Sequence, residues 1–262
     1  MPSYIVPRIL GGLGNQPFSY AAARRLALVN NAELVIDNVS GFVRDHTYQR
    51  GYQLDHFSIP CRKATAFERL EPFSRARRYL KRRLSRRLPF EERGYIVQEG
   101  IEFDSRLLQV KPHGSVYLEG YWQSEGCFRD VEATIRSDLK IIPPNDEVNR
   151  KMATQIREGL AVAVHVRFFA AQGQGGINNA PGDYYDRAVA QMETVVPGAH
   201  YFVFSDQPVV ARARIPLPDA RITCVAHNQG PAKASADLWL MTQCQYSIIA
   251  NTTFSWWGCL VG

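Results

Sequence analysis

Short apolar runs alternate with longer segments of helical periodicity along most of this chain of 262 residues. In the first part, apolar runs predict strands at residues 4–10, 34–37 and 116–121, and residues 17–30 and 125–139 have the spacing of helices. Strands and helices that alternate in this order are typical of βα units around a parallel sheet. The pattern therefore predicts an α/β domain in this part of the chain.

A second βα series follows a proline-marked break, IIPPND at residues 141–146. The break predicts a domain boundary, with one domain over 1–144 and another over 145–262. The second series predicts helices and strands in turn: strands at 160–166, 201–205, 221–225 and 247–250, and helices at 184–195 and 234–243. We therefore expect an α/β protein of two Rossmann-like domains.

Composition narrows the class of protein. The hydrophobic content of 45% is enough for a large core, and no window reaches the roughly 18 apolar residues that a membrane span needs. The first thirty residues lack the basic and apolar regions of a signal peptide. The five cysteines form no CxxC pair, which argues against a disulfide framework and a zinc site: Cys61, Cys127, Cys224, Cys244 and Cys259. We therefore expect a cytoplasmic protein.

The net charge of +6 comes from one segment, RARRYLKRRLSRR at residues 75–87, which carries eight basic residues and no acidic one. Leu80, Leu84 and Leu88 recur every four residues, so a helix would place leucines on one face and guanidinium groups around the remainder. Three interpretations stay open here: a solvated face, contact with an anionic membrane or lipid-linked glycan, and contact with nucleic acid. Of the two kinds of partner, we expect a membrane surface and not nucleic acid.

The sequence GGLGNQ, residues 11–16, lies where the first strand turns into a helix. It half matches a dinucleotide fingerprint, and Asp37 ends the second strand about 20 residues later, where such folds hold a ribose. Pro17 stands near the place of the third glycine, however, which favours two other interpretations. One is a purely structural tight turn. In the other, the carboxamides of Asn15 and Gln16 bind a sugar or a phosphate.

Polar side chains also end two strands of the second series. His165 and Arg167, in AVHVRF, lie on the same face of a strand, and a guanidinium can bind a diphosphate with paired donors. Ser205 and Asp206, in FSD, end the next strand. The carboxyl ends of parallel strands form the ligand edge of an open sheet. The alternative for Arg167 is an ion pair with a surface carboxylate.

The segment IIANTTFSWWG, residues 248–258, follows a buried strand and opens a helix. Hydroxyl groups and free amides at a helix start can hold a phosphate, whereas an N-cap before a tryptophan-rich core helix is the structural alternative. The chain has no DxD sequence, and its histidines lack ligand spacing. We therefore expect no metal and no bound cofactor, with arginine and helix-terminal donors balancing the charge of a leaving group.

Taken together, GGLGNQPFSYAAARRLAL, EGYWQSEGCFRD, AVHVRF, GDYYDRAV, FVFSD and ADLWLMTQCQYSIIANTTFSWWG resemble the bacterial α-1,2-fucosyltransferases, glycosyltransferase family 11. The resemblance implies a GT-B-like fold whose two parallel sheets face a cleft. It implies inverting, metal-independent transfer of L-fucose from GDP-β-L-fucose to a galactose-type hydroxyl of an oligosaccharide. The biological setting it implies is the synthesis of a bacterial surface polysaccharide.

The resemblance also implies roles for individual residues. Arg167 would be catalytic, neutralising the departing GDP. Donor-binding residues would be His165, Ser205, Asp206, Asp237, Asn251, Thr252, Thr253 and Phe254, with Asp237 either bonding to guanine or bracing a loop. Gly12, Gly14, Asn15 and Gln16 would face the sugar and the acceptor.

One motif departs from the family pattern. The family normally reads HVRRGDY, whereas Phe168, Phe169 and Ala170 follow Arg167 here, so a second arginine and an aspartate are missing. Asp183 is then the candidate general base. The departure keeps open a second hypothesis, a catalytically weak protein that binds a sugar nucleotide or a glycan. A third is an NAD-dependent oxidoreductase built on the glycine turn and Asp37.

Overall fold

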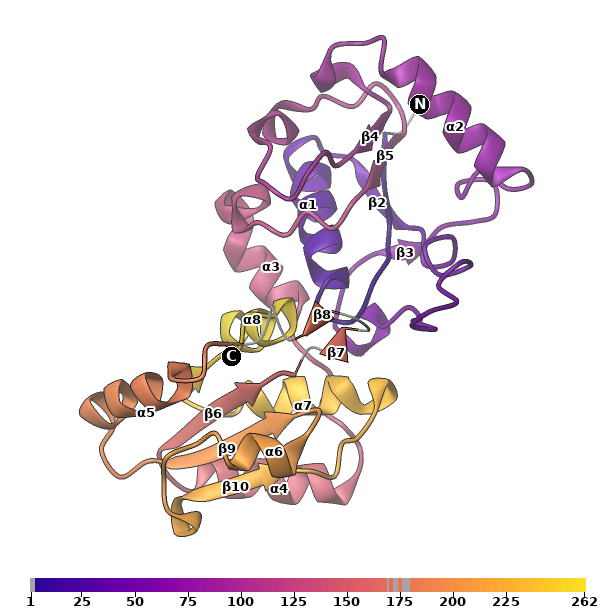
Figure 1. Ribbon diagram of the computed structural model, residues 1–262. Coiled ribbons are helices and arrows are strands. Elements are labelled where there is room, and N and C mark those ends of the chain that lie inside the picture. The colour runs from indigo at the N-terminus through magenta and orange to yellow at the C-terminus, as the bar shows by residue number, and fades with distance from the viewer. Residues whose placement is uncertain (1–2, 169, 172–173, 176–179) are drawn as a thin grey trace. The chain divides into compact units, whose positions relative to one another are not determined.

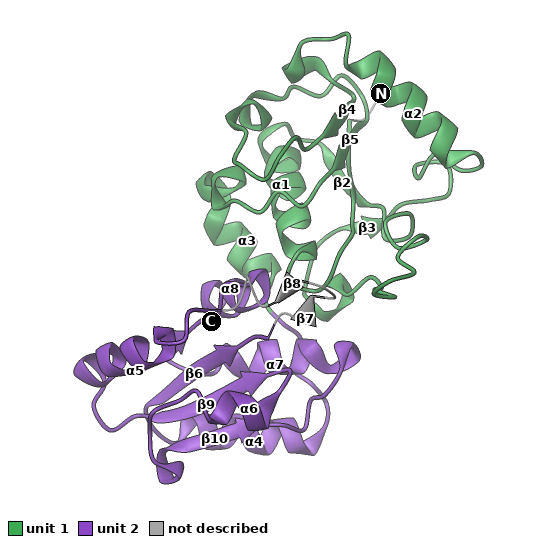
Figure 2. Ribbon diagram, viewed as in Figure 1, with its two compact units in different colours: residues 1–140 green, residues 141–262 purple. Residues whose placement is uncertain are grey.

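The computed structural model of the protein describes residues 3–168, 170–171, 174–175 and 180–262. The chain divides into two compact units, residues 1–140 and 141–262, which Figure 2 shows in green and purple. The proline-marked segment that predicted the boundary therefore opens the second unit, a few residues before the expected division at 144. Each unit has a parallel sheet with helices packed against it (Figure 1).

Among the described residues, unit 1 contains a sheet of five parallel strands in the order β3-β2-β1-β5-β4. Ile5 of the central strand lies opposite Leu34 and Val116, and all three side chains are buried. The elements are β1 (Tyr4–Arg8), α1 (Gln16–Val29), β2 (Glu33–Ile36), β3 (Arg62–Lys63), α2 (Ser74–Ser85), β4 (Tyr95–Val97), β5 (Val116–Glu119) and α3 (Glu132–Asp138), with short 3-10 turns between several of them.

Helix α1 packs closely on this sheet. It begins with Pro17 in its first turn, where a missing N–H costs no hydrogen bond, and Ala21, Ala22 and Ala23 are completely buried. Small side chains let the helix axis approach the strands. The turn that carries the glycines is therefore held between the end of β1 and the start of α1.

The helix predicted over 125–139 is wrong in its first half. Residues 125–131 form two 3-10 turns, and the α-helix α3 begins only at Glu132. The side chain of Ser124 accepts a hydrogen bond from the N–H of Gly126, which favours a local turn over a continuous helix. At the other end of α3, Asp138 accepts a hydrogen bond of 2.7 Å from Tyr20 and pairs with Arg24, which ties α3 to α1.

The described part of unit 2 has a sheet of four parallel strands in the order β10-β9-β6-β11. All six residues of β6 are buried, as expected for a central strand covered on both faces. The elements are α4 (Glu147–Arg157), β6 (Ala161–Val166), α5 (Tyr184–Val195), β9 (His200–Ser205), α6 (Pro208–Arg212), β10 (Ile222–Val225), α7 (Ala234–Met241), β11 (Tyr246–Ile248) and α8 (Thr253–Leu260), with the small pair β7 (Ala170–Ala171) and β8 (Gln174–Gly175).

Alternate residues of β6 enter different cores. Val162, Val164 and Val166 pack with Val189 of α5, whereas Ala161 and Ala163 pack with the α4 and α7 side. His165 has the parity of Ala161 and Ala163, so its ring lies on the face that also receives Phe254. Helix α4 was not predicted from the sequence; its N-cap is Asp146, whose carboxylate accepts a hydrogen bond from the N–H of Asn149.

Candidate functional site

The carboxyl edge of the unit 2 sheet gathers most of the residues expected to bind a donor. Strand β6 ends at Val166, β9 at Ser205 and β11 at Ile248, and all of these strands are parallel. Parallel strands end at the same edge, where open α/β sheets bind ligands. The predicted residues of three separate motifs therefore follow neighbouring strand ends.

Arg167 and Asp206 meet at this edge. The guanidinium Nη1 lies 3.3 Å from a carboxylate oxygen of Asp206, and the other carboxylate oxygen accepts a hydrogen bond of 3.3 Å from the N–H of Phe168. The Arg167 side chain is 45% exposed. A guanidinium carries five N–H donors, more than one carboxylate uses. The ion pair with a surface carboxylate, which the sequence left open for Arg167, is thus formed with Asp206. This ion pair does not exclude the binding of a second anion.

His165 is buried, with only 6% of its surface exposed. Burial, together with the nearby charge of Arg167, lowers the pKa of its imidazole to about 3, so the ring is neutral at pH 7. The ring centroid lies 5.3 Å from that of Phe254, and among the described residues its Nδ1 has no hydrogen-bond partner. His165 therefore packs β6 against the start of α8 and adds no positive charge to the site.

The loop before α8 is held by hydroxyl groups. Thr252 is the N-cap: its Oγ1 accepts a hydrogen bond from the N–H of Ser255, and the Oγ of Ser255 donates to the carbonyl of Ala250. Tyr184 of α5 donates a hydrogen bond of 2.7 Å to the carbonyl of Ile249. The Thr252 hydroxyl thus fixes the turn, while the amides of a first helical turn, as in α8, are the groups suited to an anion.

The remaining residues of this motif differ in exposure. Asn251 is exposed, and Thr253 and Phe254 are half-buried. The tyrosine that holds this loop, Tyr184, was not singled out from the sequence, nor was Tyr185, whose hydroxyl donates to the carbonyl of His165. The available signal was the pair of adjacent tyrosines in GDYYDRAV, one of the segments that carry the family resemblance.

Asp237 lies in the first turn of α7, and its carboxylate is hydrogen-bonded to one of a linked pair of asparagine side chains. Asn228 donates a hydrogen bond of 3.0 Å to Asp237 and another of 2.7 Å to Asn149 of α4. Burial raises the pKa of Asp237 to about 7, although the hydrogen bond from Asn228 favours the charged form. These contacts fit the bracing role that the sequence left open for Asp237, because they join α7 and α4 to the loop after β10.

The glycine turn of unit 1 is shaped by close contacts. Gly11 has φ +78°, and a Cβ there would lie 2.7 Å from the ring of Tyr121. Gly14 is buried, and Gly12 lies beside the guanidinium of Arg50, whose Nε would be 3.7 Å from a Cβ added at position 12. Only glycine is compatible with the conformation and the spacing at position 11.

The two carboxamides of the turn have different surroundings. Gln16 is completely buried: its Nε2 donates to the carbonyls of Gly11 and Gly51, and its Oε1 accepts from the N–H of Gln53. Both of its donors are therefore used inside the fold, and Gln16 braces the turn instead of facing a sugar as expected. Asn15 is half-buried, and its Oδ1 accepts a hydrogen bond of 2.8 Å from Gln123.

A second loop lies against the glycine turn. After β5, Gly120 accepts a hydrogen bond from Ser19, and the N–H groups of Tyr121 and Trp122 donate to Gln98. The segment EGYWQ is thereby fixed beside Gly11 and Asn15. Tyr121 and Gln123, like Arg50, border the expected sugar side of unit 1 but were not assigned a role from the sequence.

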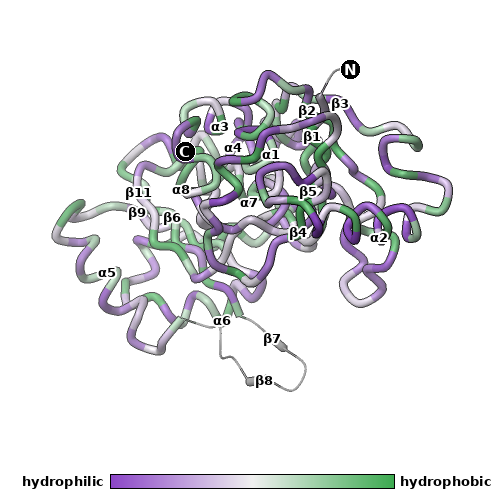
Figure 3. Tube along the Cα trace, turned by 90° about the horizontal axis from the view of Figure 1, so that it is seen from above, coloured by the Kyte–Doolittle hydropathy of each residue, from purple (hydrophilic) through white to green (hydrophobic). Residues whose placement is uncertain are grey.

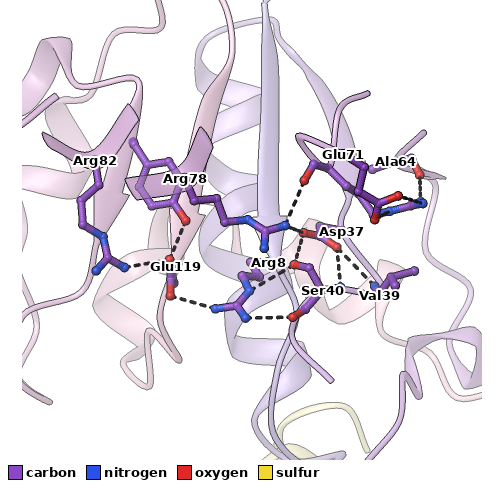
Figure 4. Close-up of polar contacts among 11 residues, drawn as sticks. Arg8, Asp37, Val39, Ser40, Ala64, Glu71, Arg78, Arg82 and Glu119 are labelled. Atoms are coloured by element: carbon purple, nitrogen blue, oxygen red, sulfur yellow. Dashed lines mark hydrogen bonds and ion pairs between the residues drawn. The ribbon is translucent and has the colours of Figure 1, made fainter. Parts of the chain in front are cut away.

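Asp37 does not offer its carboxylate to a ribose. It accepts hydrogen bonds from the N–H groups of Val39 and Ser40 and from the Ser40 hydroxyl, and it pairs with Arg78 at 3.1 Å. Figure 4 shows this network beside the ion pairs of Arg8 and Arg82 with Glu119. The carboxylate of Asp37 is only 4% exposed, so it has a structural role and the NAD interpretation loses its second element.

Asp183 lies at the start of α5 with 63% of its side chain exposed, and it pairs with Arg187 at 3.0 Å. No group of three or more His, Cys, Asp or Glu residues in the described ranges has the arrangement of a metal site. Likewise, none of the helices in the described part of the chain is long and apolar enough to cross a membrane. Phe169, part of the altered motif, lies outside the described residues.

Residues 10–261 match the profile of glycosyl transferase family 11. The chain belongs to this family. The match covers both units, from the glycine turn to the end of α8, and the chain is a glycosyltransferase. The family that the motifs suggested is thus confirmed.

Two curated proteins of Escherichia coli are similar along most of their length. An alpha-1,2-colitosyltransferase is 26% identical over 98% of this chain and 87% of its own. The O-antigen biosynthesis glycosyltransferase WbnK is 24% identical over 95% of this chain and 87% of its own. Both names describe sugar transfer, and the first specifies a sugar other than fucose.

A solved structure of the alpha-1,6-fucosyltransferase NodZ, soaked with GDP-fucose, resembles the fold with a TM-score of 0.55. The two chains are 14% identical, and the match covers 100% of this chain and 93% of NodZ. The α/β architecture of two parallel sheets is therefore GT-B-like, as expected from the sequence.

Proposed function

We propose that this family 11 enzyme transfers L-fucose from GDP-β-L-fucose to a galactose-type hydroxyl of an oligosaccharide, forming an α-1,2 linkage in a bacterial surface glycan. In this reaction the acceptor oxygen forms a bond to the anomeric carbon while the bond from that carbon to GDP breaks, which inverts the configuration. The acceptor proton leaves to a general base, and GDP leaves with its charge balanced by the protein and not by a metal.

The observation that carries the proposal is the position of Arg167 within a family 11 chain. Its guanidinium stands at the end of β6, next to the carboxylate that follows β9. Paired guanidinium donors suit the oxygens of a diphosphate, and donors that meet a developing charge stabilise the transition state. The similar fold of an enzyme soaked with GDP-fucose supports the same class of donor.

Unit 1 supplies the acceptor side in this proposal. Asn15, Gln123 and Tyr121 lie together beside the glycine turn, and amide and hydroxyl groups of this kind hydrogen-bond to sugar hydroxyls. Gln16 contributes by holding the turn in place. Asp183 is a weak general-base candidate because it is exposed and already paired with Arg187.

A second donor requires the same test, since one of the similar E. coli proteins is named as a colitosyltransferase. Colitose lacks a hydroxyl group that fucose has. A site that hydrogen-bonds this hydroxyl rejects the deoxy sugar strongly, whereas an apolar site discriminates weakly. The choice between the two sugars is therefore a question about pocket contacts within one reaction.

The test is to incubate the protein with GDP-fucose or GDP-colitose and a panel of β-galactosides, and to read the mass and linkage of the products. We expect a deoxyhexose on the 2-hydroxyl of galactose, formed equally well in the presence of a metal chelator. GDP binding by calorimetry without any product would instead favour the sugar-nucleotide-binding hypothesis. Loss of the product on chelation would contradict metal independence.

A further inference from the structure

Helix α2 is attached to unit 1 by its basic face. Arg78 pairs with Asp37 and Arg82 with Glu119, and the Nζ of Lys81 lies 5.0 Å from the ring centre of Tyr117 (Figure 4 shows the two ion pairs). Ser85, on the same side, is buried. The sheet face under α2 is lined by polar and aromatic side chains, so the basic residues find their partners there.

The leucines point the other way, contrary to the usual arrangement of an amphipathic helix. Leu80, Leu84 and Leu88, here called the leucine face, are 56%, 52% and 44% exposed. Residues four positions apart lie one above the other on a helix, so Leu80 and Leu84 form a continuous strip and Leu88 follows just beyond the helix end. Phe73 and Tyr79 add further exposed aromatic surface, at 80% and 64%.

The leucine face cannot be buried by a rotation of α2 without loss of its ion pairs. An open pocket of about 490 Å³ lies beside α2, and charged side chains border it, among them Arg8, Arg44, Arg75, Arg78, Arg82 and Glu119. Turning the leucines inward would place them against these charges and would take Arg78 away from Asp37, which is costly for a carboxylate that is only 4% exposed. Glu119 would lose Arg82 and keep Arg8. The outward direction of the leucines is therefore built into the fold.

Four more arginines near the leucine face, Arg77, Arg83, Arg86 and Arg87, are exposed. No acidic residue occurs between positions 72 and 90. Figure 3 shows α2 as a mixture of hydrophilic and hydrophobic residues on the outside of unit 1. An apolar strip within a ring of guanidinium groups has the chemistry of a helix that lies in the headgroup region of a membrane.

We propose that the leucine face and its arginines dock unit 1 onto the surface of an anionic lipid bilayer. The arginines contact lipid phosphates, and the leucines enter the boundary between headgroups and acyl chains. A second copy of the chain is a poor occupant of this surface, because it would bring two clusters of like charge together. Nucleic acid would meet the arginines but would give the leucines no apolar partner. The proposal is independent of which sugar the enzyme transfers.

The test is co-sedimentation of the whole protein with vesicles of phosphatidylcholine, with and without phosphatidylglycerol. We expect binding only to the anionic vesicles, weakened by salt. The double variant Leu80→Ser/Leu84→Ser should lose binding by tenfold or more, and Arg83→Gln/Arg87→Gln by roughly fivefold per arginine. The matched control is Val209→Ser/Val210→Ser, which removes two exposed valines of unit 2 and should bind normally.

The leucine variants should unfold at an unchanged temperature, because the side chains they remove are exposed. They should also transfer sugar to a soluble acceptor at the normal rate. Absence of binding to anionic vesicles would overturn the proposal. Vesicle binding that survives the leucine substitutions would also overturn it. So would binding of the protein to DNA that depends on the arginines and not on the leucines, or a dimer seen in sedimentation that the leucine variants abolish.

Discussion

The guanidinium of Arg167 and the carboxylate of Asp206 are joined across the ends of β6 and β9, with 3.3 Å between Nη1 and Oδ2. The two residues come from motifs 39 positions apart, and the pair orients a half-exposed guanidinium at the ligand edge of unit 2. An arginine held in this way needs little reorganisation to meet an anion.

We expect Arg167→Ala to lower kcat by a factor of about 10² to 10³, the usual effect of losing a donor to a developing charge. Thermal unfolding should change little, because the side chain is half exposed. Asp206→Asn tests the partner: it should lower kcat by less, about tenfold, if the carboxylate positions the guanidinium. Near-normal turnover of Arg167→Ala would remove Arg167 from the mechanism.

His165 should make the protein less stable in acid. Its pKa is lowered to about 3 in the folded protein, against about 6.5 in an unfolded chain. As pH falls below 6.5, the unfolded chain takes up a proton that the folded protein does not, so the free energy of unfolding decreases. In His165→Phe this loss should disappear. Urea unfolding of both proteins between pH 7 and 5, followed by tryptophan fluorescence, measures the difference; parallel curves would show that the histidine is not buried in solution.

Asp237 should produce the opposite pH dependence. Burial raises its pKa from the ordinary 3.8 to about 7, so the folded protein keeps a proton that the unfolded chain has already released. The contribution of Asp237 to the free energy of unfolding is therefore fully present below about pH 4 and is lost as pH rises towards 7. Asp237→Asn retains an acceptor for Asn228 and should remove the dependence. The check is the difference in unfolding free energy between the variant and the parent from pH 5 to 8, which should grow in favour of the variant.

Gly41 allows the loop after β2 to touch the end of β1. A Cβ at position 41 would lie 1.8 Å from the carbonyl oxygen of Ile9, so Gly41→Ala must displace backbone next to the glycine turn. We expect a loss of about 1–3 kcal/mol in unfolding free energy. Gly51→Ala is the matched control: no atom lies within 4 Å of the added Cβ, and its effect should stay within about 0.5 kcal/mol. Equal stability of the two variants would mean that the loop does not make this contact in solution.

The sequence alone determined most of the βα order and the family. Periodicity located α5 at its observed bounds, residues 184–195, because a helix with one buried face repeats its apolar residues regularly. Periodicity also located the strand ends that carry the glycines, Arg167, Asp206 and the closing motif. Parallel strands of one sheet end at the same edge, whatever their distance along the chain.

Tertiary structure decided which of those residues are available to a ligand. Gln16 and Asn15 are adjacent carboxamides in the sequence, yet only the fold brings Gly51 and Gln53 to Gln16 and commits it to bracing. For α2 the spacing of leucines gave the helix, but its orientation depended on the sheet beneath it. Asp37 and Glu119 pair with its arginines on the inner side, and the leucines face out because turning Arg78 away would leave the buried carboxylate of Asp37 without a cation.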